Sequence, residues 1–267
     1  MIDMTEALSK GDLIRLFYKL GIRPGMTLEV HASLSSLGYV IGGAQTFNDA
    51  LIELLGEEGT IIMPLQRGDA DDPASWRRPP AVYELQEKIR REAPAFDSAE
   101  SETYKMSKIY DNLRRRKKAV VSKHPSCGFV ALGKRAKYLC TGQPYDFPLG
   151  KGSPLEKLVQ LKAFCLLCGV SYDNMTSLHF GEILSGIRPV GMNGANIIEN
   201  GEKVHKNYLI HDVDSDDGFL EIGERLESRS LVSHVKEGQR DLRLLRTDIA
   251  VLEAMRYYRE RMKYYQI

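Results

Sequence analysis

Met26-Thr-Leu-Glu-Val-His-Ala32 runs directly into Ser33-Leu-Ser-Ser-Leu-Gly38. The first segment is short and rich in apolar residues, which predicts a strand. The second contains small hydroxyl residues and ends in glycine, so it predicts a loop at a strand end, where a ligand can approach the backbone. An ordinary serine-rich turn has the same composition, and the residues alone favour that simpler explanation.

Helix and strand signals alternate on both sides of this transition. Ser9 and Asp12 form a start that resembles a capping box, and they precede an apolar helix face. Apolar residues at helical spacing recur over 44–55, and Gly59–Met63 is an apolar run that predicts a buried strand ended by Pro64. The first 65 residues therefore alternate helix, strand, helix, strand, which is typical of an α/β sheet covered by helices.

The rest of the chain completes an α/β fold. Residues 66–118 are polar and rich in charge, which predicts a helical insert with long loops. Alternation resumes after Val120, and the C-terminal stretch has an apolar helical stripe that predicts a docking face. We expect one domain over residues 1–267: a mixed β-sheet flanked by helices on both faces, with the insert at about 66–118 beside the active-site cleft.

Composition narrows the class of protein. The 267 residues are 43% hydrophobic and 27% charged, as is ordinary for a globular protein, and the formal net charge is only +1. A charge this close to zero argues against nucleic acid as the main partner. No apolar run approaches the length of a membrane span, and Asp3 and Glu6 stand where a secretory signal would be apolar. We therefore expect a cytoplasmic protein without a membrane partner.

The four cysteines include one suggestive pair. Cys165 and Cys168 have the spacing of a redox or zinc pair, but they lie in a short apolar run, Ala163–Val170, that predicts a strand. Residues three apart in a strand point to opposite faces, so the two thiols would diverge. No second pair completes a zinc site. We expect core cysteines and no bound metal.

His179 and Glu182 are the strongest candidates for chemistry. If a helix begins at Thr176 as N-cap, residues three apart share one face, so the imidazole and the carboxylate lie side by side. The positive end of the helix disfavours the imidazolium and keeps the histidine able to accept a proton. The pair is therefore equipped to deprotonate an amine or hydroxyl. A partly buried histidine beside a surface glutamate remains the alternative.

Two charged stretches are ambiguous. The basic run 114–118 can attract phosphates, although most such runs are simply solvated. An acidic stretch contains Asp212, Asp214, Asp216 and Asp217 but lacks the glycine and glutamate of a calcium-binding EF-hand. It suits either an acidic rim for a polycationic ligand or a solvated loop.

Seven strings, taken in their order and spacing, resemble the aminoglycoside 3-N-acetyltransferase family. They are His31–Gly38, Gly42-Gly43-Ala44, Met63-Pro64, Asp72–Trp76, Ser122–Pro125, Gly150–Leu155 and Thr176–Glu182. The resemblance extends from about residue 20 to about residue 223. It implies transfer of an acetyl group from acetyl-CoA, the co-substrate, to an amine of an aminoglycoside or similar small polycation.

The resemblance also implies roles for individual residues. His179 matches the family's general base, with Glu182 beside it. The matching loops contact the coenzyme, which implies a set made of His31, Ser33, Leu34, Ser35, Ser36, Leu37, Gly38, Ser122, His124 and Pro125. Four carboxylates are expected to hold the cationic acceptor: Asp72, Asp111, Asp212 and Asp214. Neither metal nor nucleic acid is implied, and a homodimer stays open.

The chain departs from the family pattern near the reacting carbonyl. Leu65 stands where the family usually has threonine after Met-Pro, and it has no hydroxyl to donate to a developing oxyanion. Met106-Ser107 and Gly128 are further departures. Two alternatives therefore stay open: a CoA-binding family member that has lost catalysis, and an acetyltransferase for an amine that is not an antibiotic.

Overall fold

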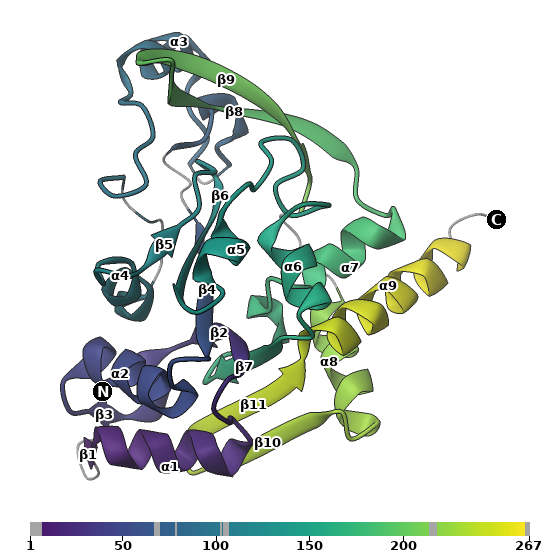
Figure 1. Ribbon diagram of the computed structural model, residues 1–267. Coiled ribbons are helices and arrows are strands. Elements are labelled where there is room, and N and C mark those ends of the chain that lie inside the picture. Colours follow the sequence, from purple (N-terminus) through teal and green to yellow (C-terminus); the bar gives the residue numbers. More distant parts are fainter. Residues whose placement is uncertain are drawn as a thin grey trace.

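The computed structural model describes residues 7–66, 70–77, 79–101, 103, 107–213 and 218–264, without the side chains of Gln66, Lys263 and Tyr264 (Figure 1). A seven-stranded mixed sheet lies at its centre. The strands lie in the order β10 (Val232–Glu237), β11 (Arg240–Arg246), β7 (Phe164–Cys168), β2 (Thr27–Ala32), β4 (Thr60–Gln66), β6 (Cys127–Gly133) and β5 (Val120–Val121). Strands β7, β2 and β4 are parallel, and the neighbours on both sides are antiparallel. Two short strands, β1 (Ala7–Leu8) and β3 (Tyr39–Val40), pair separately.

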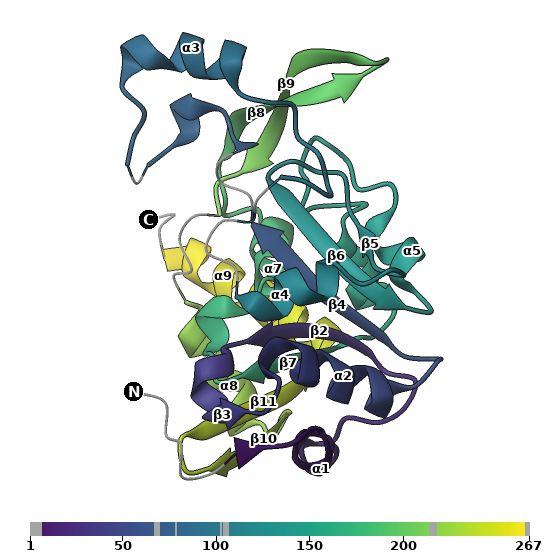
Figure 2. The same cartoon turned by 90° about the vertical axis from the view of Figure 1, so that its left-hand side faces the viewer.

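Helices cover both faces of the sheet, which confirms the predicted fold class (Figures 1 and 2). One face packs against α1 (Lys10–Leu20), α2 (Gly43–Leu55) and α4 (Lys108–Arg114). The other packs against α5 (Ala136–Cys140), α6 (Pro154–Gln160), α7 (Leu178–Ser185), α8 (Phe219–Ser228) and α9 (Thr247–Tyr264). Cys165 and Cys168 belong to cores on opposite faces, as the strand period requires, and both are free thiols.

Local signals explain most element boundaries, and one of them misled. Ser9 and Asp12 form the expected capping box at the start of α1. Strand β4, however, continues through Pro64, which lies opposite Phe129 of β6. Proline lacks an N–H for a ladder, but the pairing of β4 with β2 ends at Ile62, so Pro64 lies beyond the stretch that needs a donor toward β2. The prediction that Pro64 ends the strand was wrong.

A second layer of structure projects away from the sheet (Figures 1 and 2). It consists of a two-stranded hairpin, β8 (Val190–Glu199) and β9 (Glu202–His211), together with the 3-10 turn η3 (Pro73–Ser75) and α3 (Tyr83–Glu92) of the insert. Backbone bonds join the two parts: Asp72 N donates to Gly194 O at 2.7 Å, and Phe96 N donates to Asn196 O at 2.7 Å. The last part of the insert, α4, instead packs in the core of the main sheet.

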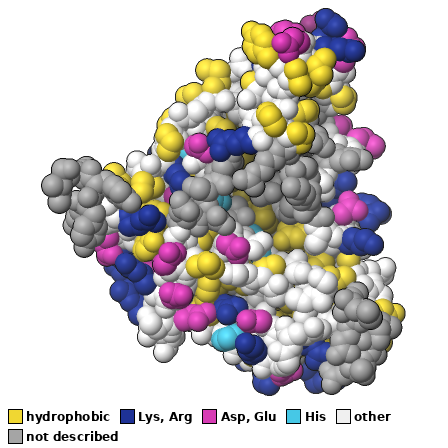
Figure 3. Space-filling model, turned by 180° about the vertical axis from the view of Figure 1, so that it is seen from behind, with side chains coloured by type: hydrophobic (Ala, Val, Ile, Leu, Met, Phe, Trp, Pro, Cys, Tyr) yellow, Lys and Arg dark blue, Asp and Glu magenta, His cyan; other side chains and the backbone are white. Residues whose placement is uncertain are grey.

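The surface mixes charges of both signs. Acidic and basic side chains are interspersed on the face shown in Figure 3, as the near-zero net charge leads one to expect. Within the residues that the structure describes, no helix is both long enough and apolar enough to cross a bilayer.

Candidate active site

A cleft of about 640 Å³ lies at the carboxyl ends of the parallel strands β4 and β7. Leu65 is the next-to-last residue of β4, and Asp173 and Thr176 follow β7. The opposite wall comes from the second layer, through residues 71–77 and the open end of the hairpin, where β8 starts and β9 finishes. Crevices at the carboxyl ends of strands are the usual ligand sites of open α/β sheets. The cleft therefore lies where this sheet is expected to bind a ligand, and the first part of the insert forms one of its walls.

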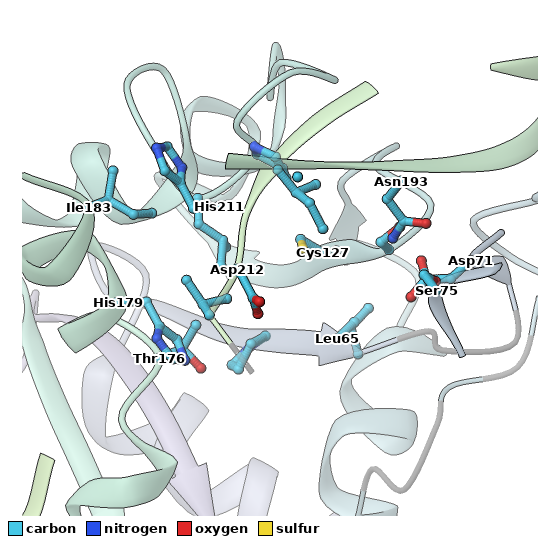
Figure 4. Close-up of a pocket in the computed structure, with 18 of the residues that line it drawn as sticks. Leu65, Asp71, Ser75, Cys127, Thr176, His179, Ile183, Asn193, His211 and Asp212 are labelled. Carbon is cyan, nitrogen blue, oxygen red and sulfur yellow. The ribbon is translucent and has the colours of Figure 1, made fainter. Parts of the chain in front are cut away.

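His179 lines this cleft and is bonded to Glu182 (Figure 4). Its Nδ1 lies 2.7 Å from Glu182 Oε2, and 16% of its side chain is exposed. The carboxylate accepts a hydrogen bond from Nδ1–H, so Nε2 of the neutral ring keeps its lone pair. The predicted N-cap, Thr176, was one residue early, because α7 begins at Leu178 with Ser177 as N-cap and without a side-chain cap bond. The pair nevertheless shares one helix face.

Glu182 is not a surface residue, which excludes the alternative of a histidine beside a surface glutamate. Its side chain is fully buried, and Oε1 accepts a hydrogen bond from Arg188 Nε at 3.0 Å and a shorter one from Arg188 Nη2. Tyr258 of α9 also hydrogen-bonds to Glu182, and burial first, then this carboxylate, raise the pKa of Tyr258 well above its usual range. The tyrosine hydroxyl therefore stays protonated and able to donate. A buried carboxylate of this kind is stabilised by its donors.

Carboxylates outnumber cations along the cleft. Among the described residues that line it, Asp71, Asp173 and Asp212 are acidic, and Arg77 is the one lysine or arginine. Arg77 Nη2 lies 3.2 Å from Asp212 Oδ2, and both side chains are substantially exposed. Figure 4 shows Asp212 near His179, and Asp71 at the opposite end of the cleft. The lining thus favours a cationic ligand.

The other predicted acceptor residues lie elsewhere. Asp72 is buried beside the cleft wall, where Arg90 donates to it at 2.7 and 2.9 Å and His205 Nε2 lies 3.0 Å away. Asp111 pairs with two arginines of its own helix region, on α4, and does not line the cleft. Asp214 lies outside the described residues, as do Asp216 and Asp217. Of the four predicted carboxylates, the structure places Asp212 in the cleft.

The predicted coenzyme loop lies next to the cleft rather than in its lining. It forms a short 3-10 helix, Leu34–Leu37, at the carboxyl end of β2, between the strands whose ends line the cleft. Ser36 Oγ donates to Ser33 O at 2.6 Å, and the same Ser36 side chain packs so closely on Gly169 that a Cβ there would overlap it. The neighbouring Gly38 closes this turn with a positive φ of 81°.

The second segment predicted to contact the coenzyme, Ser122–Pro125, supports the loop that begins at Ser126. Backbone amides of Ser126 and Cys127 donate to His124 Nδ1 at 3.2 and 3.0 Å, which leaves Nε2 to donate to Tyr145 O at 3.1 Å. Ser122 Oγ accepts from Phe129 N at 2.8 Å, and Pro125 is buried. None of Ser122, His124 and Pro125 lines the cleft, whereas the loop that His124 supports does so through Ser126 to Phe129. Their contact with the coenzyme stays a prediction.

Leu65 points into the cleft, as its place in the family pattern leads one to expect (Figure 4). It offers no hydroxyl there. Thr176 also lines the cleft and lies beside His179 in the same view, so a threonine hydroxyl is present close to the histidine although it comes from another element.

One buried cluster has the composition of a metal site. Potential ligand atoms of Glu29, His31 and Cys165 all lie within 4.8 Å of one another, beneath α7. His31 Nε2 and Glu29 Oε1, however, lie 3.0 Å apart and bond to each other, while Glu29 Oε2 has no hydrogen-bond partner among the described residues. His31 is 3% exposed and lies outside the cleft lining, although it was predicted to contact the coenzyme.

The β8–β9 hairpin, which forms part of one wall of the cleft, was not predicted from the sequence. Gly191, Met192, Asn193 and the stretch 210–213 all line the cleft. The signal was available, because Asn200-Gly201 joins two runs of ten residues and adopts positive φ angles of 53° and 86°. His211 at the end of β9 also lines the cleft, and burial lowers its pKa, which keeps the ring uncharged at neutral pH.

Comparisons with known proteins identify the family. The family model for aminoglycoside 3-N-acetyltransferase matches residues 30–259. The SPbeta prophage-derived aminoglycoside N(3')-acetyltransferase-like protein YokD of Bacillus subtilis is 35% identical over 240 residues, which cover 90% of this chain and 88% of that protein. Aminoglycoside N(3)-acetyltransferase VII of Streptomyces paromomycinus is 36% identical over 219 residues, covering 78% and 72% of the two chains.

Solved structures share the fold. The crystal structure of YokD superimposes with a TM-score of 0.93 at 33% identity, covering 97% of this chain and 96% of that one. AAC-IIIb, solved as a binary complex with CoASH, has a TM-score of 0.85 at 22% identity and covers 96% and 98%; at that identity it shows the fold alone. The family model spans most of the chain, and two relatives exceed 30% identity. The chain therefore belongs to the aminoglycoside 3-N-acetyltransferase family, a family of acyltransferases.

Proposed function

We propose that this protein transfers the acetyl group of acetyl-CoA to an amino group of an aminoglycoside or a similar polycationic amine, directly and within a ternary complex. The observation that carries the proposal is the His179–Glu182 pair, which presents an imidazole nitrogen at a cleft lined by an excess of carboxylates. Family membership supports the acetyl transfer, and the CoASH complex of AAC-IIIb supports CoA as the donor's carrier. Residues 1–267 would act as one domain, since the cleft takes residues from both layers.

The proposed reaction begins with the acceptor amine facing His179. The amine nitrogen attacks the thioester carbonyl carbon, and His179 Nε2 takes the proton that the nitrogen loses. The tetrahedral intermediate collapses, the C–S bond breaks, and CoA leaves as a thiolate that takes up a proton. Glu182 holds His179 in the tautomer that can accept and stabilises the imidazolium that forms. Arg188 and Tyr258 keep Glu182 in place through its hydrogen bonds.

Stabilisation of the oxyanion needs a donor near Leu65. The family's usual threonine is absent there, but Thr176 lines the same cleft and lies beside His179 (Figure 4). A single well-placed donor of this kind contributes about 2.7–4 kcal/mol to transition-state stabilisation in well-studied acyl-transfer enzymes. We propose that Thr176 supplies part of this stabilisation.

The acceptor's charge matches the cleft. Protonated amino groups of a polycation would lie against Asp71, Asp173 and Asp212, while the reacting amine loses its proton to His179. Arg77 already neutralises part of this charge through Asp212. The exposed pair is weak in water, so an incoming ammonium group can compete for the carboxylate.

A thiol-release assay tests the proposal. Acetyl-CoA is mixed with an aminoglycoside, with a linear polyamine or with a neutral monoamine, and free CoA and acetylated product are both quantified. The proposal expects turnover with at least one polycation and far less with the monoamine. Release of CoA without acetylated amine, or no turnover with any amine despite CoA binding by calorimetry, contradicts it.

The second candidate, a CoA-binding protein without catalysis, is favoured by one observation, the apolar Leu65 in the cleft. The same experiment separates it from the first candidate. Calorimetric binding of CoA with no acetylated product from any amine supports this candidate. Absence of any CoA binding contradicts both.

A further inference from the structure

Two titratable side chains are buried in the middle of the sheet, and the proposed reaction does not use them. Glu29 and His31 are 1% and 3% exposed, on the central strand β2. They share one face of the strand, while Leu28 and Val30 point into the apolar core on the other face. A buried polar pair on a central strand costs stability unless its hydrogen bonds are satisfied, so its partners are informative.

The partners are the backbone amides that lead into α7. Ser177 N donates to Glu29 Oε1 at 3.2 Å, and Thr176 N lies 3.4 Å from His31 Nε2. The histidine nitrogen itself lies 3.0 Å from the same Glu29 oxygen. These contacts join β2 to the segment immediately before His179.

The other amides around the start of α7 bond to backbone carbonyls. Met175 N donates to Tyr172 O, and the amides of residues 178, 179 and 180 donate to the carbonyls three positions earlier, at 2.9–3.1 Å. The N–H groups of Thr176 and Ser177 face side chains instead: Ser177 N donates to Glu29 Oε1, and Thr176 N lies 3.4 Å from His31 Nε2, both on β2. Ser177, the N-cap, makes no side-chain cap bond of its own.

We infer that Glu29, supported by His31, acts as a positioning residue that caps α7 from the neighbouring strand and thereby fixes His179 over the cleft. The inference rests on the proposed function for its catalytic consequence. The positive end of a helix favours an acceptor that carries negative charge, and Glu29 supplies one where the local sequence has no capping bond. Because His179 N bonds to Thr176 O, a shift of residues 176–177 shifts the imidazole with it.

Cys165 lies beside Glu29 and His31, the two residues that we call the anchor. It lies opposite Glu29 in the pairing of β2 with β7, and burial together with Glu29 raises the pKa of its thiol well above the usual value. The thiol is therefore neutral and adds no charge beside the carboxylate. Two further titratable groups lie near the carboxyl end of β2: Cys168 opposite Ala32, and Tyr110, which contacts Val30 O and Ala32 N from the opposite face.

The test compares a variant that loses the hydrogen-bond acceptor of Ser177 N with a variant that keeps it. Glu29→Leu removes the oxygen that Ser177 N needs, whereas Glu29→Gln keeps a carbonyl oxygen. Displacement of a catalytic group by about 1 Å can cost about a hundredfold in rate. We expect kcat of Glu29→Leu to fall about ten- to a hundredfold, with KM for both substrates changed less than about twofold and with Glu29→Gln retaining most of kcat.

Asn48→Leu is the matched control. Asn48 is fully buried on the opposite face of the sheet, where it donates to Ile109 O at 2.9 Å, so its loss destabilises the fold without touching the anchor. All variants are assayed at a temperature at which circular dichroism shows them folded. Equal kcat losses in Asn48→Leu and Glu29→Leu, or unchanged kcat in Glu29→Leu, would overturn the inference. So would a Glu29→Gln variant as slow as Glu29→Leu.

Amide hydrogen exchange tests the anchor independently of any activity. In the wild-type protein, the amide of Ser177 is expected to exchange as slowly as the amides of β2, and Glu29→Gln should preserve that protection. Rapid exchange of Ser177 in the wild type would overturn the inference even if Glu29→Leu failed to fold. Slow exchange of Ser177 together with no turnover on any amine would support the anchor and contradict the proposed function. A raised KM for acetyl-CoA in His31→Gln, with kcat intact, would assign His31 to the coenzyme and contradict its place in the anchor.

Discussion

Arg188 holds one oxygen of Glu182 while His179 bonds to the other. Arg188 Nε donates to Oε1 at 3.0 Å, and His179 Nδ1 lies 2.7 Å from Oε2. The two oxygens of one buried carboxylate thus have different partners, each a donor. This division fixes which proton His179 carries and makes the pair sensitive to a change that preserves its shape.

Glu182→Gln is expected to be severe for this reason. Arg188 can only donate, so the amide oxygen must face it, and the amide nitrogen then faces His179 Nδ1 as a donor. The histidine is forced into the tautomer that carries its proton toward the cleft. The equivalent change in serine proteases costs about ten-thousandfold in kcat, and we expect a loss here of about a hundred- to ten-thousandfold, no larger than that of His179→Ala. Steady-state kinetics checks it; a kcat near the wild-type value would mean that the amide oxygen faces His179.

Leu65→Thr is expected to raise turnover. The variant restores a hydroxyl at the end of β4, where the side chain already points into the cleft. If the hydroxyl reaches the developing oxyanion, it contributes at most about 2–4 kcal/mol to the transition state, which appears in kcat rather than KM. Leu65→Val is the control of similar shape without an oxygen. An unchanged kcat would show that Thr176 or a backbone amide already serves.

Asp212→Asn is expected to weaken binding of a polycationic acceptor. The carboxylate is partly exposed, so its loss should raise KM for the amine about two- to fivefold, and added salt should shrink the difference. Asp111→Asn removes the same charge outside the cleft and should leave KM unchanged. A larger effect of Asp111→Asn would favour the acceptor site predicted from the sequence over the one that the cleft defines.

Asp72 is expected to make the junction of insert and hairpin sensitive to acid. Burial alone would raise its pKa, but hydrogen bonds from Arg90 and from Ala74 N outweigh burial and lower the pKa below 3.8. A lowered folded-state pKa stabilises the protein above about pH 4, and this contribution is lost as the pH falls through the lowered value. In urea unfolding, Asp72→Asn should therefore be less stable than the wild type at pH 7, with the gap narrowing near pH 3. A gap that is constant with pH would contradict the ionised pair.

Elements specified by neighbouring residues could be predicted from the sequence. The capping box of α1 and the Ser153 cap before α6 are formed within four residues, so the pattern and the structure agree. The alternation of strands and helices also gave the fold class. The hairpin was missed although Asn200-Gly201 signals it, because the runs around that turn are too polar to stand out as buried strands.

The site was predictable only in part, for a physical reason. His179 and Glu182 share a helix, so their spacing is enough to bring them together. Arg188 and Tyr258 reach Glu182 from other elements, and Asp71 and Asp173 join the cleft lining, through the tertiary fold alone. The burial of Glu29 and His31 was likewise invisible, because a strand with two polar residues in alternate positions is typical of one solvated face.

The most direct test of the account is the turnover of His179→Ala. General-base catalysis contributes about a hundred- to ten-thousandfold, so kcat should fall by that factor while calorimetry shows nearly unchanged affinity for CoA. The control is His234→Ala. It removes a partly exposed histidine of β10 that pairs with Asp241 of β11, and it should retain full activity. If His179→Ala keeps the wild-type kcat, the pair is structural and the proposed mechanism is wrong.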